Sequence, residues 1–271
     1  MDKNRNKKTT SWDNVSHWYD KMLSDEDSYQ QKVIKPNLLR ILNIQKDNIT
    51  SERVLDLGCG QGFFSEVIAE AGAYVEGVDI SPELIKIAKK NSSVRGIKNI
   101  NYVVGSVSAP LSFKDRYFDK VVSVLAMQNI KDASFAISEC VRVLKEKGSL
   151  VVVLNHPVFR VPKGKGGGSD WGYDTKTGEQ YRKVYEYLSE KNVEIVMNPG
   201  EVARGKKSVN TYSFHRPLQL YFKMFAKSGL AVTRLEEWIS HKESEKGPKK
   251  EWEDKARKEI PLFMMLEAKE I

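Results

Sequence analysis

The sequence predicts an α/β fold, namely a doubly wound sheet of seven mostly parallel strands. Short apolar runs alternate along the chain with longer segments of helical periodicity, as they do when helices join parallel strands. A glycine-rich turn, from Gly58 to Gly62, directly follows the first apolar run. An acid, Asp79, ends the second apolar run about 20 residues beyond Gly58, a spacing typical of nucleoside-binding strand pairs.

The expected strands are apolar and rich in β-branched residues, with turn residues between them. They span residues 53–57, 74–79, 100–104, 119–124, 149–154, 230–237 and 262–269. The expected helices have apolar residues at helical spacing and span 62–71, 82–94, 132–145 and 215–228. No clear helical pattern separates the last two strands, so the last strand is expected to insert antiparallel to its neighbours.

The two ends of the first 44 residues differ in character. Residues 1–11 are polar and basic, and we expect them to be a disordered arm. Residues 12–44 contain helical patterns rich in aromatic side chains, and Pro36 is expected in the first turn of the second of these helices. Residues 12–271 are therefore expected to form a single domain.

A long insertion at about 157–212 interrupts the alternation of strands and helices. It begins with a glycine-rich stretch and then alternates as strands do over 181–188, 193–196 and 209–214. Because it follows the fifth strand, it lies at the carboxyl edge of the sheet, where doubly wound folds bind ligands. We expect it to form a lid over a substrate, and the alternative is a surface insertion without such a role.

Composition sets further limits on the class of protein. The chain is 40% hydrophobic, enough for a substantial core, and its formal net charge is +8. The start of the chain is polar and no apolar run approaches the roughly 18 residues of a membrane span, so a cytoplasmic protein without a membrane partner is expected. Two cysteines, Cys59 and Cys140, fit a reducing compartment. The excess of lysine is interpreted as a solvated surface, with a nucleic-acid partner as the alternative.

The residues around the glycine turn favour one kind of nucleoside ligand. Glycines let the backbone turn sharply and approach a ligand, and the following helix offers free N–H groups to it. Asp79 suits ribose hydroxyls. Asp56, two residues ahead of Gly58, would repel a pyrophosphate but would suit a ligand with an ammonium group. These features point to S-adenosylmethionine, whose methionine end carries an amino group.

Two segments, Asp56-Leu57-Gly58-Cys59-Gly60-Gln61-Gly62 and Val78-Asp79-Ile80-Ser81, resemble the class I S-adenosylmethionine-dependent methyltransferases, especially the small-molecule type. The resemblance covers about residues 12–156 and 213–271. It implies a Rossmann-like fold whose seventh strand is antiparallel, a methyltransferase activity and S-adenosylmethionine as cofactor. It leaves the insertion without a counterpart.

The resemblance also implies cofactor-binding positions. Asp56 and the backbone of Gly58, Cys59 and Gly60 would hold the methionine end, Asp79 the ribose, and Ile80 the adenine face. Relatives often place an acid after the third strand, whereas this chain has Ser106 followed by Val107, which weakens the expected adenine contact. Further cofactor contacts are expected from Leu125, after the fourth strand, and from Tyr19 in the N-terminal helices.

The residues that we consider for catalysis and for acceptor binding lie mostly just after the ends of predicted strands. His156, directly after the fifth strand, is the first candidate for a general base, and the alternative is that it orders the lid through a structural hydrogen bond. His215 is the second candidate, and Arg216 beside it could bind an acidic group, although both could instead cap and pack the next helix. Acceptor contacts are also expected from Tyr29 and Gln128.

No spacing of histidines and cysteines in the sequence suggests a metal site. The leading hypothesis is therefore metal-independent methyl transfer to O or N of a small molecule. An RNA methyltransferase is the first alternative, because of the net charge of +8 and the basic arm. A cofactor-binding protein without catalysis is the second alternative, and the oligomeric state is not indicated.

Overall fold

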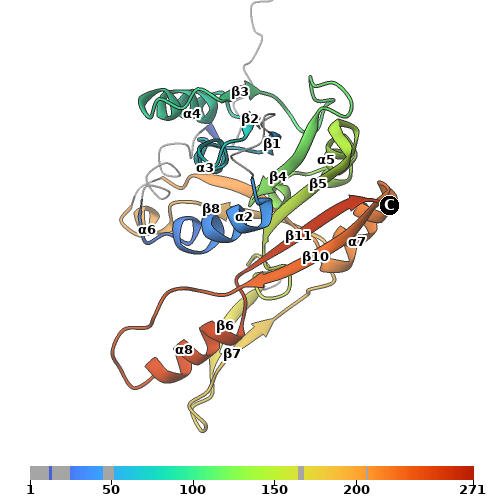
Figure 1. Cartoon of the computed structure of the whole chain (residues 1–271). Helices are drawn as coiled ribbons and strands as arrows, with labels where there is room; N and C mark the ends of the chain where they lie inside the picture. Colours follow the sequence, from blue (N-terminus) through green and yellow to red (C-terminus); the bar gives the residue numbers. More distant parts are fainter. Residues whose placement is uncertain (1–11, 14–24, 45–51, 164–167, 206) are drawn as a thin grey trace, which may run out of the picture.

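A computed structural model of the chain describes residues 12–13, 25–44, 52–163, 168–205 and 207–271. Its central sheet has seven strands in the order β10-β11-β5-β4-β1-β2-β3 (Figure 1). Their bounds are β1 Arg53–Leu57, β2 Tyr74–Asp79, β3 Ile100–Val104, β4 Phe118–Val124, β5 Leu144–Asn155, β10 Leu230–Trp238 and β11 Phe263–Glu270. β11 runs antiparallel to both of its neighbours, while the pairs from β5 to β3 are parallel. The predicted doubly wound, seven-stranded fold is confirmed.

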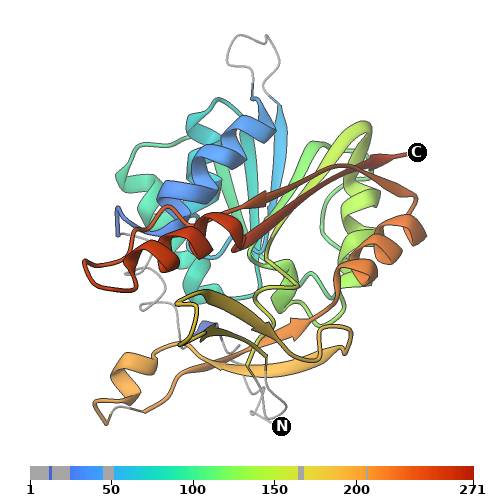
Figure 2. The ribbon, with the colours of Figure 1, turned by 90° about the horizontal axis from the view of Figure 1, so that it is seen from below.

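Helices connect the strands and cover both faces of the sheet. They are η2 Gln30–Ile34, α2 Lys35–Leu42, α3 Phe63–Glu70, α4 Pro82–Val94, η3 Met127–Asn129, α5 Ala133–Val143, α6 Pro199–Val202, α7 Leu218–Lys227 and α8 Lys250–Glu259. Figures 1 and 2 show α5 and α7 on one side of the sheet and α2 and α3 on the other. α4 packs against β2 and β3 at one edge of the sheet.

The alternation of side chains along β5 shows why both faces need a cover. Leu150, Val152 and Leu154 join the core cluster that includes the buried faces of α5 and α7. Val151 and Val153, between them in sequence, join the opposite cluster with η2, α2 and α3. A strand with apolar side chains on both faces is stable only when both are buried, so β5 lies inside the sheet and not at its edge.

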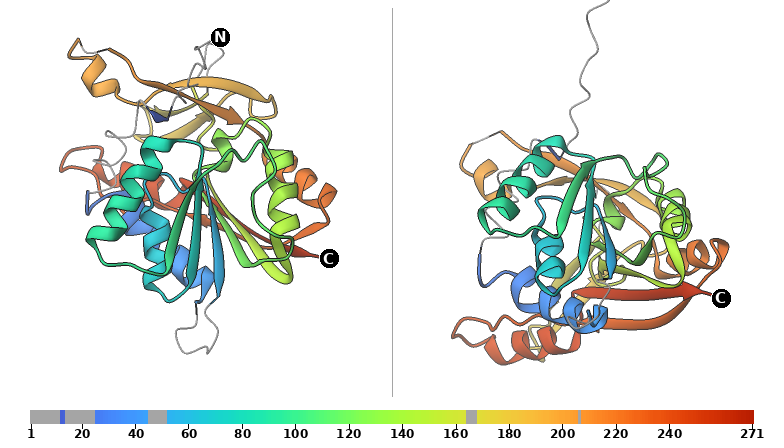
Figure 3. Two further views of the ribbon diagram at one scale, coloured as in Figure 1. Left: turned by 90° about the horizontal axis from the view of Figure 1, so that it is seen from above. Right: turned by 45° about the horizontal axis from the view of Figure 1, so that its top comes forward.

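The insertion forms two antiparallel strand pairs. β6 (Ser169–Tyr173) pairs with β7 (Gln180–Val184), and β8 (Lys191–Val196) pairs with β9 (Asn210–His215). Figure 3 shows, in its left view, that these strands lie across the end of the sheet toward which the parallel strands run. The expected position at the carboxyl edge therefore agrees with the structure.

The short helices η3 and α6 were not expected from the sequence, and two longer elements, β6 and α8, also depart from the sequence expectations. β6 was not expected, and it forms because Gly172 leaves room for the ring of Tyr181, which an added Cβ would approach to 2.4 Å. α8 lies between β10 and β11, where no clear helix was expected, and Ala256 is its one buried residue. Contacts with the β6–β7 pair hold α8 in place, because Trp252 lies against Gly178. Because eight of its ten residues are charged, α8 has too few apolar residues for a sequence pattern to indicate a helix there.

The N-terminal helical segment has an irregular start. η2 is a π-helix in which the N–H of Lys35 donates to the carbonyl of Gln30. Pro36 follows and lies in the first turn of α2, as predicted. Proline has no N–H, so a wider turn at this point loses no additional hydrogen bond.

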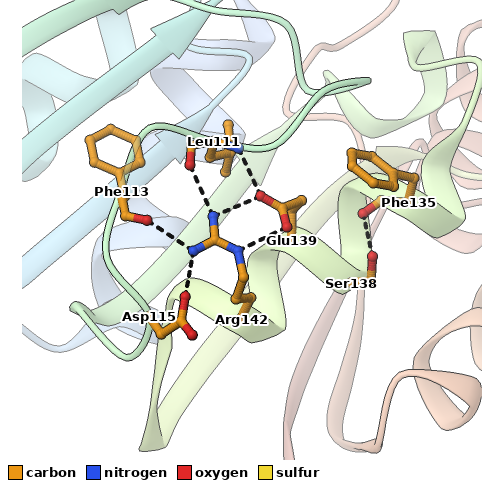
Figure 4. Close-up of polar contacts among 7 residues, drawn as sticks. All are labelled: Leu111, Phe113, Asp115, Phe135, Ser138, Glu139 and Arg142. Carbon is orange, nitrogen blue, oxygen red and sulfur yellow. Dashed lines mark hydrogen bonds and ion pairs between the residues drawn. The ribbon is translucent and has the colours of Figure 1, made fainter.

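Arg142, on α5, ties down the connection between β3 and β4 (Figure 4). Its guanidinium donates to the carbonyl oxygens of Leu111 (3.0 Å) and Phe113 (2.9 Å), to Asp115 Oδ1 (2.7 Å) and to both carboxylate oxygens of Glu139. The Glu139 carboxylate also accepts from the N–H of Leu111 at 2.7 Å. The nearby guanidinium lowers the pKa of Glu139. One side chain thus replaces the regular hydrogen bonds that this loop lacks.

We predict that Arg142→Ala lowers the free energy of unfolding by about 2–3 kcal/mol, because it leaves two carbonyls and a partly buried carboxylate without their charged donor. Arg234→Ala is the control, since its side chain is 46% exposed and its ion pair with Glu267 is long at 3.5 Å, and it should cost less than about 1 kcal/mol. Urea denaturation of both variants measures the difference. Equal losses would contradict the role given to Arg142.

Candidate functional site

A cavity of about 300 Å³ opens at the carboxyl ends of β1, β2, β3 and β4. Its size is at the lower end of the range of small-molecule sites, about 300–1,000 Å³. Its walls come from strand ends, from β9 of the insertion and from the N-terminal segment. The lining residues include Trp12, Gly58, Gly60, Asp79, Ile80, Ser106, Val107, Leu125, Thr211 and Phe214. The structure therefore brings together most of the cofactor-binding residues expected from the sequence.

The glycine turn makes one wall of this cavity. Gly58, Gly60 and Gly62 have φ values of 76°, 56° and 89°, which favour glycine. A Cβ on Gly58 would also meet the Cβ of Ala126 at 2.4 Å, so the turn packs directly against the segment after β4. The N–H groups of Gly58 and Cys59 both donate to the carbonyl of Val78. Cys59 is buried, and its part in ligand binding remains a prediction.

Asp79 ends β2 and is held by two backbone donors. Its Oδ2 accepts from the N–H of Gly60 at 2.9 Å and its Oδ1 from the N–H of Ser81 at 2.9 Å. Burial raises the pKa of Asp79, and these two hydrogen bonds oppose the rise. Each carboxylate oxygen keeps a further lone pair for a hydroxyl donor. The side chain thus fits the ribose of an adenosine group.

Asp56 lies beneath the turn and is only 1% exposed. Its Oδ2 accepts from the Ser65 hydroxyl at 2.6 Å. Burial, together with the charge of Asp79, raises the pKa of Asp56 to about 7, although the Ser65 hydrogen bond opposes that rise. A buried carboxylate with a raised pKa is stabilised in its charged form by a nearby cation. Asp56 does not itself line the cavity, and its contact with the ammonium group of a cofactor stays a prediction.

The opposite wall of the cavity is apolar. Ile80 is 45% exposed, whereas its neighbour Val78 is 1% exposed, so an apolar side chain follows the strand without a protein cover. Val107 and Leu125 line the same cavity, and Leu125 has a φ of 54°. Ser106 uses its hydroxyl to accept from the N–H of Ser108 at 3.2 Å. These walls fit a flat aromatic base such as adenine.

A second cavity, of about 530 Å³, adjoins the first. Trp12, Leu125, Asn129 and Thr211 line both cavities and so form the boundary between them. The second cavity also takes in the N-terminal helical segment, the end of β5, the insertion and the loop after β10, represented by Tyr29, Gln128, Asn155, Arg160, Met197 and Lys242. Tyr29 and Gln128, which were expected to contact the acceptor, therefore share one cavity.

His156 does not line either of these two cavities. Its Nε2 lies 2.6 Å from Glu237 Oε1, and its Nδ1 accepts from the N–H groups of Val158 and Phe159. Both ring nitrogens are thus committed, with the proton on Nε2. Burial lowers the pKa of His156, while the charge of Glu237 opposes this shift. The geometry agrees with the alternative interpretation, in which His156 orders the chain that follows it, and the role of general base stays a prediction.

His215 and Arg216 lie at the end of β9 and line a small third cavity of about 30 Å³. His215 donates from Nε2 to the carbonyl of Tyr187 at 2.7 Å, and burial lowers its pKa, so the ring is neutral at pH 7. Arg216 donates to the carbonyls of Ile130 and Lys131 at 2.8 and 2.7 Å. Its packing role is therefore visible, and its role in substrate binding remains a prediction.

Tyr19 lies outside the described residues, as does the arm 1–11. Several lining residues had no role in the sequence-based site, and we consider four of them, namely Trp12, Asn155, Arg160 and Thr211. Asn155 was the most accessible to prediction, because it ends β5 directly before His156. The other three depend on how the N-terminal segment and the insertion fold over the strand ends, which no local pattern indicates.

Within the described ranges, the structure contains no group of three or more His, Cys, Asp or Glu side chains placed to hold a metal ion. The described helices are also too short or too polar to cross a membrane.

Comparisons with known proteins find similar methyltransferases. Residues 55–152 match a family model described as a methyltransferase domain. The curated ubiquinone biosynthesis O-methyltransferase of Xylella fastidiosa strain 9a5c is 33% identical over 104 residues, which cover 38% of this chain and 42% of that protein. The chain spans about half of the length of the curated relatives it matches, so their activity is not transferred to it directly.

Solved structures share the fold over nearly the whole chain. An S-adenosylmethionine-dependent methyltransferase from Mesorhizobium loti superposes with a TM-score of 0.64 at 22% identity, covering 88% of this chain and 98% of that one. The CcbJ methyltransferase from Streptomyces caelestis superposes with a TM-score of 0.64 at 13% identity, covering 97% and 98%. Residues 55–152 thus match a methyltransferase domain, and the strand order and superpositions show that the chain shares the fold of S-adenosylmethionine-dependent methyltransferases.

Proposed function

We propose that the protein transfers a methyl group from S-adenosylmethionine to an oxygen or nitrogen of a small molecule, without a metal ion. The observation that carries the proposal is the second cavity, of about 530 Å³, which adjoins the cofactor cavity across Leu125 and Asn129. Its walls come from four separate parts of the chain, which favours an acceptor small enough to be surrounded. Flat or elongated acceptors such as RNA would need an open surface instead.

The cofactor supplies an activated methyl group whose leaving group is a neutral thioether. The protein has to hold the donor, align the acceptor and keep water away. Asp79 would fix the ribose, Asp56 the ammonium group, and Ile80 with Val107 the adenine. Leu125 and Asn129, on the boundary between the cavities, would then face the path of the methyl group.

An acceptor that carries a proton on its attacking atom also needs a base. Of the two candidate histidines, His215 suits this task better than His156. Its Nδ1 makes no hydrogen bond within the described part of the chain, and its ring is kept neutral by burial. It lines the small third cavity, which shares Gln128, Asn155 and Arg160 with the second one. We therefore propose His215 as proton acceptor and His156 as a positioning residue.

We predict that Asp79→Asn weakens the binding of S-adenosylmethionine about 10- to 100-fold, because the ribose loses charge-assisted hydrogen bonds. Glu83→Gln, an exposed change four residues further on, is the control and should bind normally. Titration calorimetry gives both affinities. Wild-type affinity in Asp79→Asn would remove the ribose role from this residue.

The raised pKa of Asp56 predicts a pH dependence of cofactor binding. Below its pKa of about 7 this carboxyl is protonated in the free protein, and a bound ammonium group favours the ionised form. Affinity should therefore rise with pH by up to about tenfold per unit below pH 7 and level off above it. Calorimetry between pH 5.5 and 8 measures the slope.

Asp56→Asn is the control for this slope, because the pKa of Asp79 is also raised and could contribute. The variant should bind more weakly and lose most of the dependence on pH. A slope that is the same in both proteins would assign the titration to another group.

Methyl-labelled S-adenosylmethionine and a fractionated cell extract test the proposal as a whole. Label is expected in the small-molecule fraction. Label in RNA would replace the proposal by an RNA methyltransferase. The net charge of +8 would then contribute to binding the RNA phosphates. Bound cofactor without label in any fraction would contradict catalysis and leave a cofactor-binding protein. Removal of divalent ions with a chelator should leave the rate unchanged.

A further inference from the structure

We propose that the small-molecule acceptor carries an oxyanion, a carboxylate or a phosphate, and that the guanidinium of Arg160 binds it in the second cavity. The inference rests on the proposed function, because it names the class of acceptor for the same site. The anionic group is distinct from the atom that receives the methyl group. It serves as the anchor that fixes the acceptor relative to the cofactor.

Arg160 is an unneutralised charge on the cavity wall. Its side chain lines both the second cavity and the small third one. Within the described part of the chain its guanidinium makes no ion pair and no hydrogen bond. Its Cζ lies over the ring of Phe263, 5.3 Å from the centroid, and its charge also interacts with Tyr29 and Arg182. Burial lowers the pKa of Arg160, which nonetheless stays charged at neutral pH. Arg160 is partly buried, and a partly desolvated cation without an ion-pair partner is costly, which is unusual unless a ligand supplies the anion.

The protein holds this guanidinium in a fixed position. The turn that carries Arg160 is closed by its own N–H, which donates to the carbonyl of His156 at 2.8 Å. The ring of His156 accepts from the N–H groups of Val158 and Phe159 and is held in turn by Glu237. Phe263 covers one face of the guanidinium, so its edge, with the N–H donors, is free to meet a planar oxyanion. His156 is thus a positioning residue for Arg160.

The charged side chains near Arg160 are mostly basic, and Asp25 is the acid among the described residues that line the second cavity. Arg182 donates to the carbonyl of Phe159 at 2.7 Å and stacks on Trp171. Arg216 donates to the carbonyls of Ile130 and Lys131. Neither guanidinium forms a salt bridge in the described ranges. The Arg216 Nη1 atom is buried without a well-formed hydrogen bond, although its charge is close enough to oppose the raised pKa of Tyr221. Lys242, also on the second cavity, is already paired with Asp27 at 3.1 Å. An anion entering this region would meet uncompensated positive charge.

The amide groups of the same wall would complete an oxyanion site. Gln128 uses its Oε1 to accept from the N–H of Asn155 at 2.8 Å, which leaves its amide N–H groups available. The Asn155 side chain lines the second and third cavities beside Arg160. Amide and guanidinium donors at one end, with apolar side chains such as Met197 and Phe263 nearby, suit a small organic acid.

The test uses the full chain with methyl-labelled S-adenosylmethionine and the small-molecule fraction of a cell extract. The labelled product should be retained on an anion-exchange column at pH 7. At pH 2.5 a carboxylate is protonated and is released, whereas a phosphate ester stays charged and is retained, so the two sources of the oxyanion are told apart. A labelled product that passes through the column at pH 7 would overturn the inference while supporting the proposed function.

Arg160→Gln supplies the second arm. With dilute extract its rate of label transfer should fall about 30-fold or more, since the anion loses a charged donor, and concentrated extract should restore part of the rate. Its affinity for S-adenosylmethionine should not change. Arg234→Gln, outside the cavities, is the matched control and should transfer label like the wild type. A wild-type rate in Arg160→Gln would overturn the role of Arg160.

Thermal unfolding without any acceptor is the third arm, and it is independent of turnover. Removing an unpaired buried charge should leave the unfolding temperature of Arg160→Gln equal to or above that of the wild type. A clear decrease would show that Arg160 has a structural role and would overturn the inference. Absence of label in every fraction would instead contradict the proposed function, and the unfolding temperature alone would then decide on Arg160.

Discussion

Three hydrogen bonds between the turn after β1 and the end of β2 hold the cofactor cavity together. The N–H groups of Gly58 and Cys59 donate to the carbonyl of Val78, and that of Gly60 donates to the Asp79 carboxylate. They join two neighbouring strands at their carboxyl ends, where parallel pairing alone has stopped. The direction of the turn, the orientation of Asp79 and the start of the next helix all follow from these bonds.

The same junction contains two buried carboxyl groups whose desolvation destabilises the free protein. Asp56 and Asp79 are both buried at it, and burial raises the pKa of each. The free protein therefore holds two carboxyl groups that water would solvate better. A cationic ligand with hydroxyl donors relieves both, because it brings positive charge to one carboxyl and hydrogen bonds to the other. Burial of these two carboxyl groups destabilises the free protein, and binding of such a cationic ligand would offset that destabilisation.

The sheet was accessible from sequence because each of its strands is marked locally. Apolar runs such as Val54–Leu57 are buried on both faces and have no helical period, and glycine or proline limits them. β6 and α8 have no comparable sequence pattern. β6 depends on Gly172 making room for Tyr181, and α8 on contact with a strand pair about 70 residues away in sequence. Elements whose stability comes from one tertiary contact cannot be recognised from their own residues.

The residues proposed to bind the cofactor were predicted from the spacing between the glycine turn and Asp79. The residues proposed to bind the acceptor come from distant segments, so they could be identified only from the folded structure. His156 attracted a catalytic role because of its residue type and its place after β5. Its environment favours the alternative role of ordering the chain, since Glu237, from a strand 81 positions later, hydrogen-bonds its Nε2, and the catalytic role stays a prediction. Arg160 had no distinguishing pattern at all. What sets it apart is the absence of an ion-pair partner in the described structure, which only the packing of the insertion and of β10 and β11 determines.

The charges at the two cavities differ, and this arrangement constrains what each can bind. Asp79 lines the first cavity and Asp56 lies beneath it, where the proposed cofactor would bring the positive charges of its ammonium and sulfonium groups, whereas Arg160 lines the adjoining cavity. An oxyanion would be repelled from Asp56 and Asp79 and attracted to Arg160. Each ligand is thus excluded from the cavity of the other by like charge. The boundary at Leu125 and Asn129 then becomes the one place where donor and acceptor meet, so the alignment that methyl transfer requires follows from electrostatics as much as from shape.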